Sequence, residues 1–345
     1  MYRKLFHAIG WIVVILSFTV ISPTWLPSVH AQTQKLVFHD PMPPSTMNDG
    51  AIWWMDEVEK RTGGKVKFER IFGGAMGKFG DQMKNVKGRI FDIGLTSIVY
   101  TPAAYPLTTI FIQPFIVPNL TKGVYASYDL FQSNTALAKE GTAINTKIVG
   151  QWWLEALELM SHVPINKMDD MKGLKIRGHG GSADAMAAAG FTVVGIPWSE
   201  LPQASERRVV DAASLPIPTL AAETGYQDIF KYWITNIPFY HFHSYLSINL
   251  DAWNSLSRDV QDVMLKTGAD LRKYNVEHVT KKIDENAKVL AKAGVKQIRF
   301  PQEEREKFVK IGGPPNWEKW VKAREAEKLP GREILNQFNK LLEKY

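Results

Sequence analysis

The chain has 345 residues, of which 45% are hydrophobic and 22% charged, and it contains no cysteine. This length suggests two domains or one large domain, and the composition is that of an ordinary folded protein. The lack of cysteine excludes a disulfide framework, a thiolate nucleophile and a lipobox anchor. The net charge of +7 is spread among acidic residues, so we expect no nucleic-acid-binding face and instead an attraction for small anions.

The N-terminal segment has the pattern of a signal peptide. A basic start at Arg3 and Lys4 precedes an apolar run over residues 8–21, and "VHA" at 29–31 is close to a small-residue cleavage site. An uncleaved membrane anchor is the alternative, but the run is short for a bilayer span. We therefore expect residues 1–31 to be removed and the mature protein to be exported to a bacterial periplasm.

The chain after this segment alternates between strand and helix patterns. We expect strands at 35–40, 65–72 and 90–98, with helices within 46–64 and after the glycine loop that begins at 73. This β-α-β-α-β order favours an open, largely parallel sheet with helices on both faces. A loop from Gln113, a helix within 123–141 and a strand at 143–153 follow.

A second series of strands and helices begins near Lys167. We expect strands at 174–177, 192–196 and 209–214, helices at 182–190 and 199–208, and a strand and capped helix within 242–256. The stretch 258–293 has sustained helical periodicity and is long enough to run across both modules. Two such modules, joined by more than one crossing, predict a cleft. Arg177 ends the strand "LKIR", and ligands in such sheets bind at the carboxyl ends of strands.

Motifs that would mark an enzyme or a cofactor are missing from the sequence. "GHGGS" at 178–182 is weakly similar to an oxyanion loop, but no serine follows in a nucleophile turn, so we favour a flexible strand-to-helix turn. His241 and His243 have a spacing that can begin a zinc site, but no further ligand is nearby, and we favour hydrogen-bonded or ligand-lining histidines. Glu155 and Glu158 have no feature that marks them as acid and base. We expect no cofactor and no metal.

Tryptophan placement is more informative. Trp152 and Trp153 fall at the end of a predicted strand, and Trp198 follows a proline at the exit from another strand. Most large aromatic residues belong to a core, but an indole at a strand exit is placed to form one wall of a cleft.

Several separated segments resemble the periplasmic solute receptors of TRAP (tripartite ATP-independent periplasmic) transporters, the DctP-type family. They include "KMDDMKGLKIRGHGG" at 167–181, "AAAGFTVVGIPWSELPQA" at 187–204, "RRVVDAA" at 207–213 and "NLDAWNSLSRDVQDVMLKTGADL" at 249–271. The resemblance implies an α/β, two-lobed periplasmic-binding-protein-like fold of type II, with the lobes bridged by a long helix. The expected boundaries are 32–153 plus about 242–281 for lobe I, and 154–241 plus about 282–345 for lobe II.

The resemblance also implies roles for individual residues. Arg177 would form a bidentate contact with a ligand carboxylate, and the glycines that follow it would leave room for the ligand. Trp198 would stack on the ligand. The chain departs from the family where many relatives carry a second arginine, here near Leu157, and an asparagine, here Leu215. Because two polar partners are replaced by leucines, we expect a monocarboxylate or sulfonate with an apolar or aromatic body.

Further candidates surround these positions. Trp152, Trp153 and Phe239 are expected to help enclose the ligand, and Glu155 or Glu158 to accept a hydrogen bond from it. The remaining candidates near the cleft are His39, Ser97, Tyr100, His179, His241 and His243.

The resemblance implies a receptor that delivers its ligand to the small and large membrane subunits of a permease, lies peripheral to the membrane and needs no catalytic group. Two alternatives stay open: a periplasmic hydrolase that uses His179, Ser182 and an acid, and a ligand receptor of a signalling system.

Overall fold

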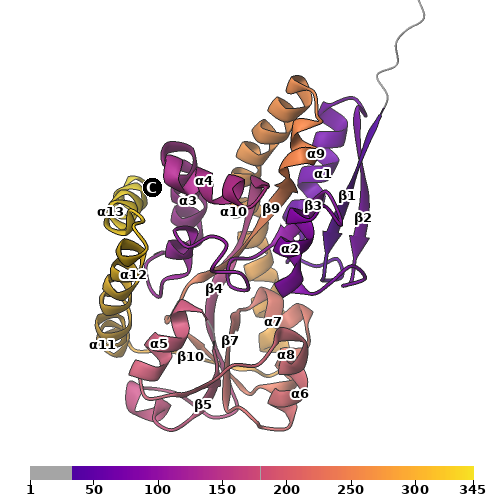
Figure 1. The fold of residues 1–345 in the computed structure, drawn as a ribbon. Helices are drawn as coiled ribbons and strands as arrows, with labels where there is room; N and C mark the ends of the chain where they lie inside the picture. The colour runs from indigo at the N-terminus through magenta and orange to yellow at the C-terminus, as the bar shows by residue number, and fades with distance from the viewer. Residues whose placement is uncertain (1–32, 179) are drawn as a thin grey trace, which may run out of the picture. The chain divides into compact units, whose positions relative to one another are not determined.

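A computed structural model describes residues 33–178 and 180–345, so the expected signal peptide and His179 lie outside the described residues. Ten strands form one connected sheet in the order β2-β1-β3-β9-β4-β7-β5-β6, and β8 pairs with β4 and with β10 (Figure 1). Among the helices of the described part, none is long and apolar enough to cross a membrane.

The first half of the sheet is built from the N-terminal strands. β1 (Gln34–Asp40) pairs in parallel with β2 (Val66–Phe72) and β3 (Ile93–Thr96), and β9 (His241–Asn249) runs antiparallel to β3. Helices α1 (Asp49–Arg61) and α2 (Gln82–Lys87) follow β1 and β2. The β-α-β-α-β order expected from the sequence is therefore present.

One long strand, β4 (Thr146–Ser161), joins the two halves of the sheet. Its first part pairs with β9, and its last part pairs with β7 (Ala212–Pro216) and β8 (Tyr232–Thr235). The sequence predicted a strand that ends at 153, with Glu155 and Glu158 beyond it. Both carboxyl groups are instead buried and accept hydrogen bonds from the protein, so the strand continues through them.

The second half of the sheet has β5 (Lys175–Arg177) between two parallel neighbours, β7 and β6 (Thr192–Val194). β10 (Lys296–Arg299) lies at the edge, beside β8. Four helices belong to this half: α5 (Gly181–Ala188), α6 (Leu201–Glu206), α7 (Thr219–Glu223) and α8 (Tyr226–Ile229). The names lobe I and lobe II are kept below for the halves that carry β1–β3 and β5–β7.

Two helices occupy the segment for which one loop and one helix were expected. α3 (Leu120–Ser133) begins after Asn119, whose side chain accepts a hydrogen bond from the N–H of Lys122 at 2.9 Å. α4 (Thr135–Ala143) begins after Asn134, whose side chain accepts from the next helix in the same way. Since an asparagine side chain satisfies the free N–H groups of a helix start, Asn134 divides the predicted helix into two.

The long helix α10 (Arg258–Lys292) follows the short α9 (Leu250–Asn254) and contacts α1, α3, β4 and α7, which belong to both lobes (Figure 1). The side chain of Asn275 accepts a hydrogen bond from the N–H of Trp153 at 2.8 Å and donates to the Trp153 carbonyl at 2.7 Å. The helix therefore satisfies main-chain groups of β4 and crosses both lobes, as the sequence predicted.

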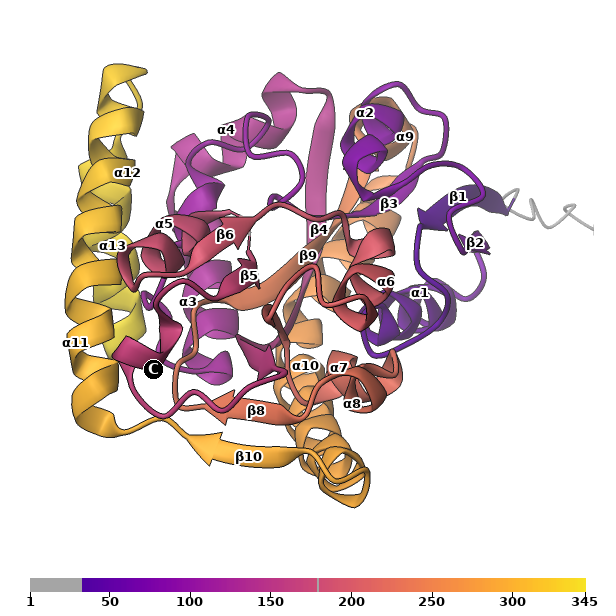
Figure 2. The same ribbon diagram turned by 90° about the horizontal axis from the view of Figure 1, so that it is seen from below.

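The C-terminal helices lie along one side of the protein in both views (Figures 1 and 2). They are α11 (Gln302–Gly312), α12 (Pro314–Ala326) and α13 (Gly331–Lys344). α11 packs on α5 in lobe II, whereas α13 packs on α3 in lobe I. The assignment of residues 282–345 to lobe II stays a prediction. α11 lies beside a helix of lobe II, whereas α13, within the same range, packs on a helix of lobe I.

Candidate ligand-binding site

Arg177 lies at the end of β5 and is only 2% exposed. Its Nε donates a hydrogen bond to the Ile196 carbonyl at 3.3 Å, and Nη1 donates to the Ser214 carbonyl at 3.4 Å. Nη2 has no hydrogen-bond partner in the described part of the chain. Burial lowers the pKa of the guanidinium, since removal from water disfavours its charge. A buried cation whose Nη2 nitrogen has no partner among the described residues is a strong site for an anion.

Aromatic side chains surround this guanidinium. Its Cζ lies 5.7 Å from the ring centre of Trp198, within the range of a cation–π contact. Burial raises the pKa of Tyr100, Tyr226 and Tyr240, while the charge of Arg177 acts in the opposite direction on each. The hydroxyls of Tyr226 and Tyr240 are buried and have no hydrogen-bond partner among the described residues. These phenols stay neutral at physiological pH and can donate to an acceptor.

A small cavity of about 10 Å³ opens beside Arg177. Its walls come from both lobes and are mostly apolar: Met47, Phe79, Tyr100, Leu157, Arg177, Trp198, Pro216, Leu220 and Phe242. Phe79 stacks on Tyr100, with ring centres 5.1 Å apart. The volume is about that of one water site, far below the roughly 300 Å³ typical of ligand pockets. A ligand therefore enters only if the walls separate.

The structure brings three of the predicted site residues, Arg177, Trp198 and Tyr100, together at this cavity. Leu157, predicted to replace a second arginine, also lines it. Leu215 does not, because adjacent residues of a strand face opposite sides: Pro216 lines the cavity, whereas Leu215 packs in a separate core cluster.

The other predicted aromatic residues belong to the core. Trp153 stacks on His243, with ring centres 4.3 Å apart, and Trp152 donates from Nε1 to the Thr46 carbonyl at 2.9 Å. Phe239 packs against Phe308 and Phe115. These three rings are completely or almost completely buried and do not line the Arg177 cavity.

Three predicted histidines in the described part of the chain, His39, His241 and His243, and the predicted Ser97 are buried and do not line the cavity. His241 and His243 contact the carbonyls of Leu154 and His241, and burial lowers their pKa to about 4, so both are neutral. Ser97 donates to the His243 carbonyl at 3.2 Å. His39 accepts a hydrogen bond at Nε2 from the N–H of Met76.

Neither Glu155 nor Glu158 lines the cavity. Glu158 accepts hydrogen bonds from the Trp233 indole and the Asn236 N–H, both at 2.8 Å. Glu155 accepts from the N–H of Thr219 at 2.6 Å, at the start of α7. Burial raises the pKa of each carboxyl to about 7. Glu155 therefore holds the start of α7, whose Leu220 forms part of the cavity wall.

The exchange Glu155→Gln is expected to reduce the dependence of stability on pH. The Glu155 pKa is about 7 in the folded protein and 4.5 ordinarily, so folding favours the protonated form. The stability that this carboxyl contributes is complete below pH 4.5 and falls by roughly 3 kcal/mol as the pH rises to 7. Urea unfolding at pH 5 and pH 8 measures the change, with Glu158→Gln as the matched comparison. If Glu155→Gln loses as much stability between pH 5 and pH 8 as the wild type does, the raised pKa is wrongly assigned to Glu155.

A catalytic arrangement is not evident in the described residues. His179 lies outside them, and Ser182 is buried in α5. Residues 33–178 and 180–345 contain no group of three or more histidine, aspartate or glutamate side chains placed to hold a metal ion.

Sequence reasoning missed several residues of the site. They come from helices, turns and a strand of both lobes: Tyr226, Tyr240, Met47, Phe79, Leu220 and Phe242. Only the alternation of β9 offered a local signal, because Phe242 must face away from His241 and His243.

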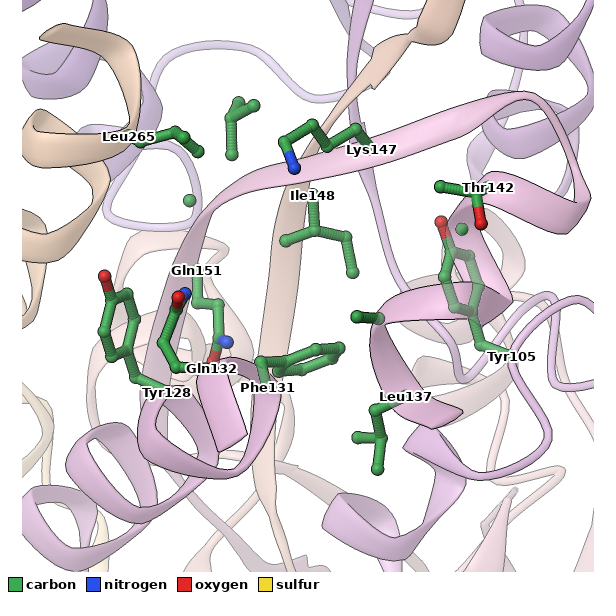
Figure 3. A pocket seen from close by; sticks show the side chains of 14 residues that line it. Tyr105, Tyr128, Phe131, Gln132, Leu137, Thr142, Lys147, Ile148, Gln151 and Leu265 are labelled. Carbon is green, nitrogen blue, oxygen red and sulfur yellow. The ribbon is translucent and has the colours of Figure 1, made fainter. Parts of the chain in front are cut away.

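A second cavity, of about 290 Å³, lies between α3, α4, α10 and the first part of β4 (Figure 3). Phe131 and Ile148 stand at its centre, and Tyr128, Gln132 and Gln151 gather on one side. Its polar groups are largely used within the protein: Gln151 accepts from Ser127 at 2.9 Å, and Tyr105 is bonded to Thr146. Among its described lining side chains no buried polar atom lacks a partner, in contrast to Arg177. The Arg177 cavity is therefore the stronger candidate.

Two lobes that share a sheet and a crossing helix, with a buried cation between them, define a two-lobed solute-binding protein of type II. The family model of bacterial extracellular solute-binding proteins, family 7 (DctP), matches residues 39–322, and the chain belongs to this family. The resemblance seen in the sequence is confirmed. Because the members are solute-binding proteins, the chain is a receptor rather than an enzyme.

Similar proteins agree with this assignment. A solute-binding protein of Albidiferax ferrireducens is 24% identical over 302 residues, 83% of this chain and 87% of that one. A TRAP solute-binding protein of Rhodoferax ferrireducens, solved with copurified benzoate, has a TM-score of 0.82 at 20% identity and covers 90% of this chain and 98% of its own. A marine metagenome TRAP protein specific for aromatic acids, solved with 3-hydroxybenzoate, has a TM-score of 0.81 at 20% identity, with 90% and 98% covered. Other structures of this fold hold orotic acid or β-D-glucuronate.

Proposed function

We propose that this protein is the periplasmic receptor of a TRAP transporter and carries a small monocarboxylate with an apolar or aromatic body. The observation that carries the proposal is Arg177: a buried guanidinium whose Nη2 nitrogen has no partner among the described residues, in a cavity whose other walls are mainly apolar. The carboxylate would bind Nη2, and Trp198 would cover the body of the ligand. The receptor then delivers the ligand to the two membrane subunits of the permease.

The walls favour an apolar body over a sugar acid. Met47, Leu157, Pro216, Leu220 and Phe242 offer no side-chain hydrogen bond. A uronate in this place would bury several hydroxyls without partners, and each costs about 1–3 kcal/mol. The unpartnered hydroxyls of Tyr226 and Tyr240 can serve the carboxylate or a single polar substituent. The benzoate and 3-hydroxybenzoate complexes of proteins with this fold are in keeping with the proposal.

The closed cavity also requires that the lobes separate during binding. At about 10 Å³ it does not accommodate a benzoate ring. Since its walls come from lobe I (Phe79, Tyr100) and lobe II (Arg177, Trp198), separation of the lobes exposes the guanidinium to incoming acids.

Isothermal titration with matched ligands tests the proposal. Benzoate and benzamide have nearly the same shape, but only benzoate carries a negative charge, and hexanoate and β-D-glucuronate vary the body. We expect benzoate or hexanoate to bind, benzamide to bind at least a hundredfold more weakly, and glucuronate to give no heat. Tighter binding of benzamide or glucuronate would contradict the proposal.

A further inference from the structure

A pair of hydrogen bonds joins the two lobes beside the cavity. Thr46, in the loop between β1 and α1, donates from its backbone N–H to Glu223 Oε2 at 3.0 Å. Its hydroxyl donates to Glu223 Oε1 at 2.5 Å. Glu223 is the last residue of α7, in lobe II, so one carboxylate uses both oxygens to hold one residue of lobe I. Figure 1 shows α1 and β1 in the upper half of the protein and α7 in the lower half.

Each partner is directly connected to a wall of the cavity. Met47, next to Thr46, forms a wall on the lobe I side, and Leu220, one helical turn before Glu223, forms a wall on the lobe II side. The pair therefore fixes the distance between two walls without lining the cavity itself.

Both partners are also anchored within their own lobes. The Thr46 carbonyl accepts a hydrogen bond from the Trp152 indole at 2.9 Å, and Trp152 is part of the core on β4. At the other end, Glu155 of β4 accepts from the N–H of Thr219, the first residue of α7. Because neither partner moves freely, loss of their contact must accompany a displacement of the β1–α1 loop from α7.

We propose that Glu223 is a positioning residue that slows ligand release by holding the lobes closed. The inference rests on the proposed function, because it needs a ligand at Arg177. Thr46 is buried, whereas Glu223 is exposed at the surface. When the lobes separate, water replaces the hydrogen bonds of the Glu223 carboxylate at little cost, so the contact favours closure without locking it.

Stopped-flow measurement of benzoate release from the full mature protein, followed by tryptophan fluorescence, tests this role. In Glu223→Ala we expect the dissociation rate to rise roughly threefold to tenfold, the range for exposed charge-assisted hydrogen bonds, with the association rate changed less than twofold. Glu223→Gln keeps one acceptor and should restore part of the slow release. Glu206→Ala, which removes an exposed carboxylate at the end of α6, is the matched control and should behave as the wild type.

The outcomes separate this inference from the proposed function. If the wild type binds none of the tested acids, the proposed function fails. If the wild type binds benzoate but Glu223→Ala releases it at the wild-type rate, or Glu206→Ala accelerates release equally, the role of Glu223 is wrong while the function stands. Thr46→Val, which removes the hydroxyl donor and keeps the backbone N–H, should give a smaller acceleration than Glu223→Ala. An equal or larger effect would also contradict the proposed pairing.

Discussion

Replacement of Arg177 by methionine is expected to remove ligand binding while leaving the ligand-free protein at least as stable as the wild type. A ligand carboxylate buried without its cation loses about 2–5 kcal/mol of binding free energy. The ligand-free protein, in contrast, is relieved of a buried charge that has no carboxylate partner among the described residues and whose pKa is lowered by burial. Replacing such a charge by an apolar side chain is often neutral or stabilising.

Titration calorimetry with benzoate and thermal unfolding without ligand measure the two effects separately. Arg177→Lys is the control, since it keeps the positive charge and loses the planar pair of donors. It should bind more weakly than the wild type and more strongly than the methionine variant. A methionine variant with wild-type affinity would show that the ligand binds elsewhere. A methionine variant that binds nothing because it fails to fold would show that Arg177 supports the structure through Ile196 and Ser214.

The part of the site that sequence analysis predicted depends on features local to the chain. Arg177 stands at the carboxyl end of a recognisable strand, and Trp198 follows a proline at a strand exit, so both positions follow from the strand pattern. The alternation of strands and helices and the long stretch 258–293 predicted two lobes and a crossing helix for the same reason.

The rest depends on which face of a strand a residue occupies. Leu215 and Pro216 are neighbours, yet only Pro216 reaches the cavity, and Phe242 reaches it while His241 and His243 do not. A shift of one residue in register reverses every such assignment, and composition does not determine the register. Met47 and Leu220 are far apart in the sequence, yet both line the cavity. The hydrogen bonds between their neighbours Thr46 and Glu223 are long-range contacts, which no local sequence pattern predicts.

The partners of the two acidic residues in β4 could not be predicted from the sequence. Glu155 and Glu158 were expected to be solvated or hydrogen-bonded, with a ligand contact as a further possibility, since carboxylates are rarely buried without partners. The structure supplies those partners from Thr219, Trp233 and Asn236, which are brought beside β4 by α7 and β8. Once the fold satisfies these carboxyls, they no longer indicate the ligand site.

The second large effect is expected at Gly268, in the first third of α10. An alanine in place of glycine ordinarily stabilises a helix by up to about 1 kcal/mol. At Gly268, however, an added Cβ would lie 2.0 Å from the carbonyl oxygen of Val149, a main-chain atom of β4. The helix would have to withdraw from the strand and would weaken the hydrogen bonds of Asn275 to Trp153. We expect Gly268→Ala to lower the free energy of unfolding by about 3 kcal/mol or more.

Denaturant unfolding of Gly268→Ala beside Gly195→Ala measures this effect. An added Cβ at Gly195 meets no atom within 4 Å, so that control should change the stability by less than about 1 kcal/mol. If both variants are as stable as the wild type, α10 does not pack closely against the β4 backbone at Val149. A large loss at Gly268 alone would instead establish that the backbone contact between helix and strand is needed for stability. Since α10 contacts both lobes, the lobes would then have to move about a helix that is fixed to β4.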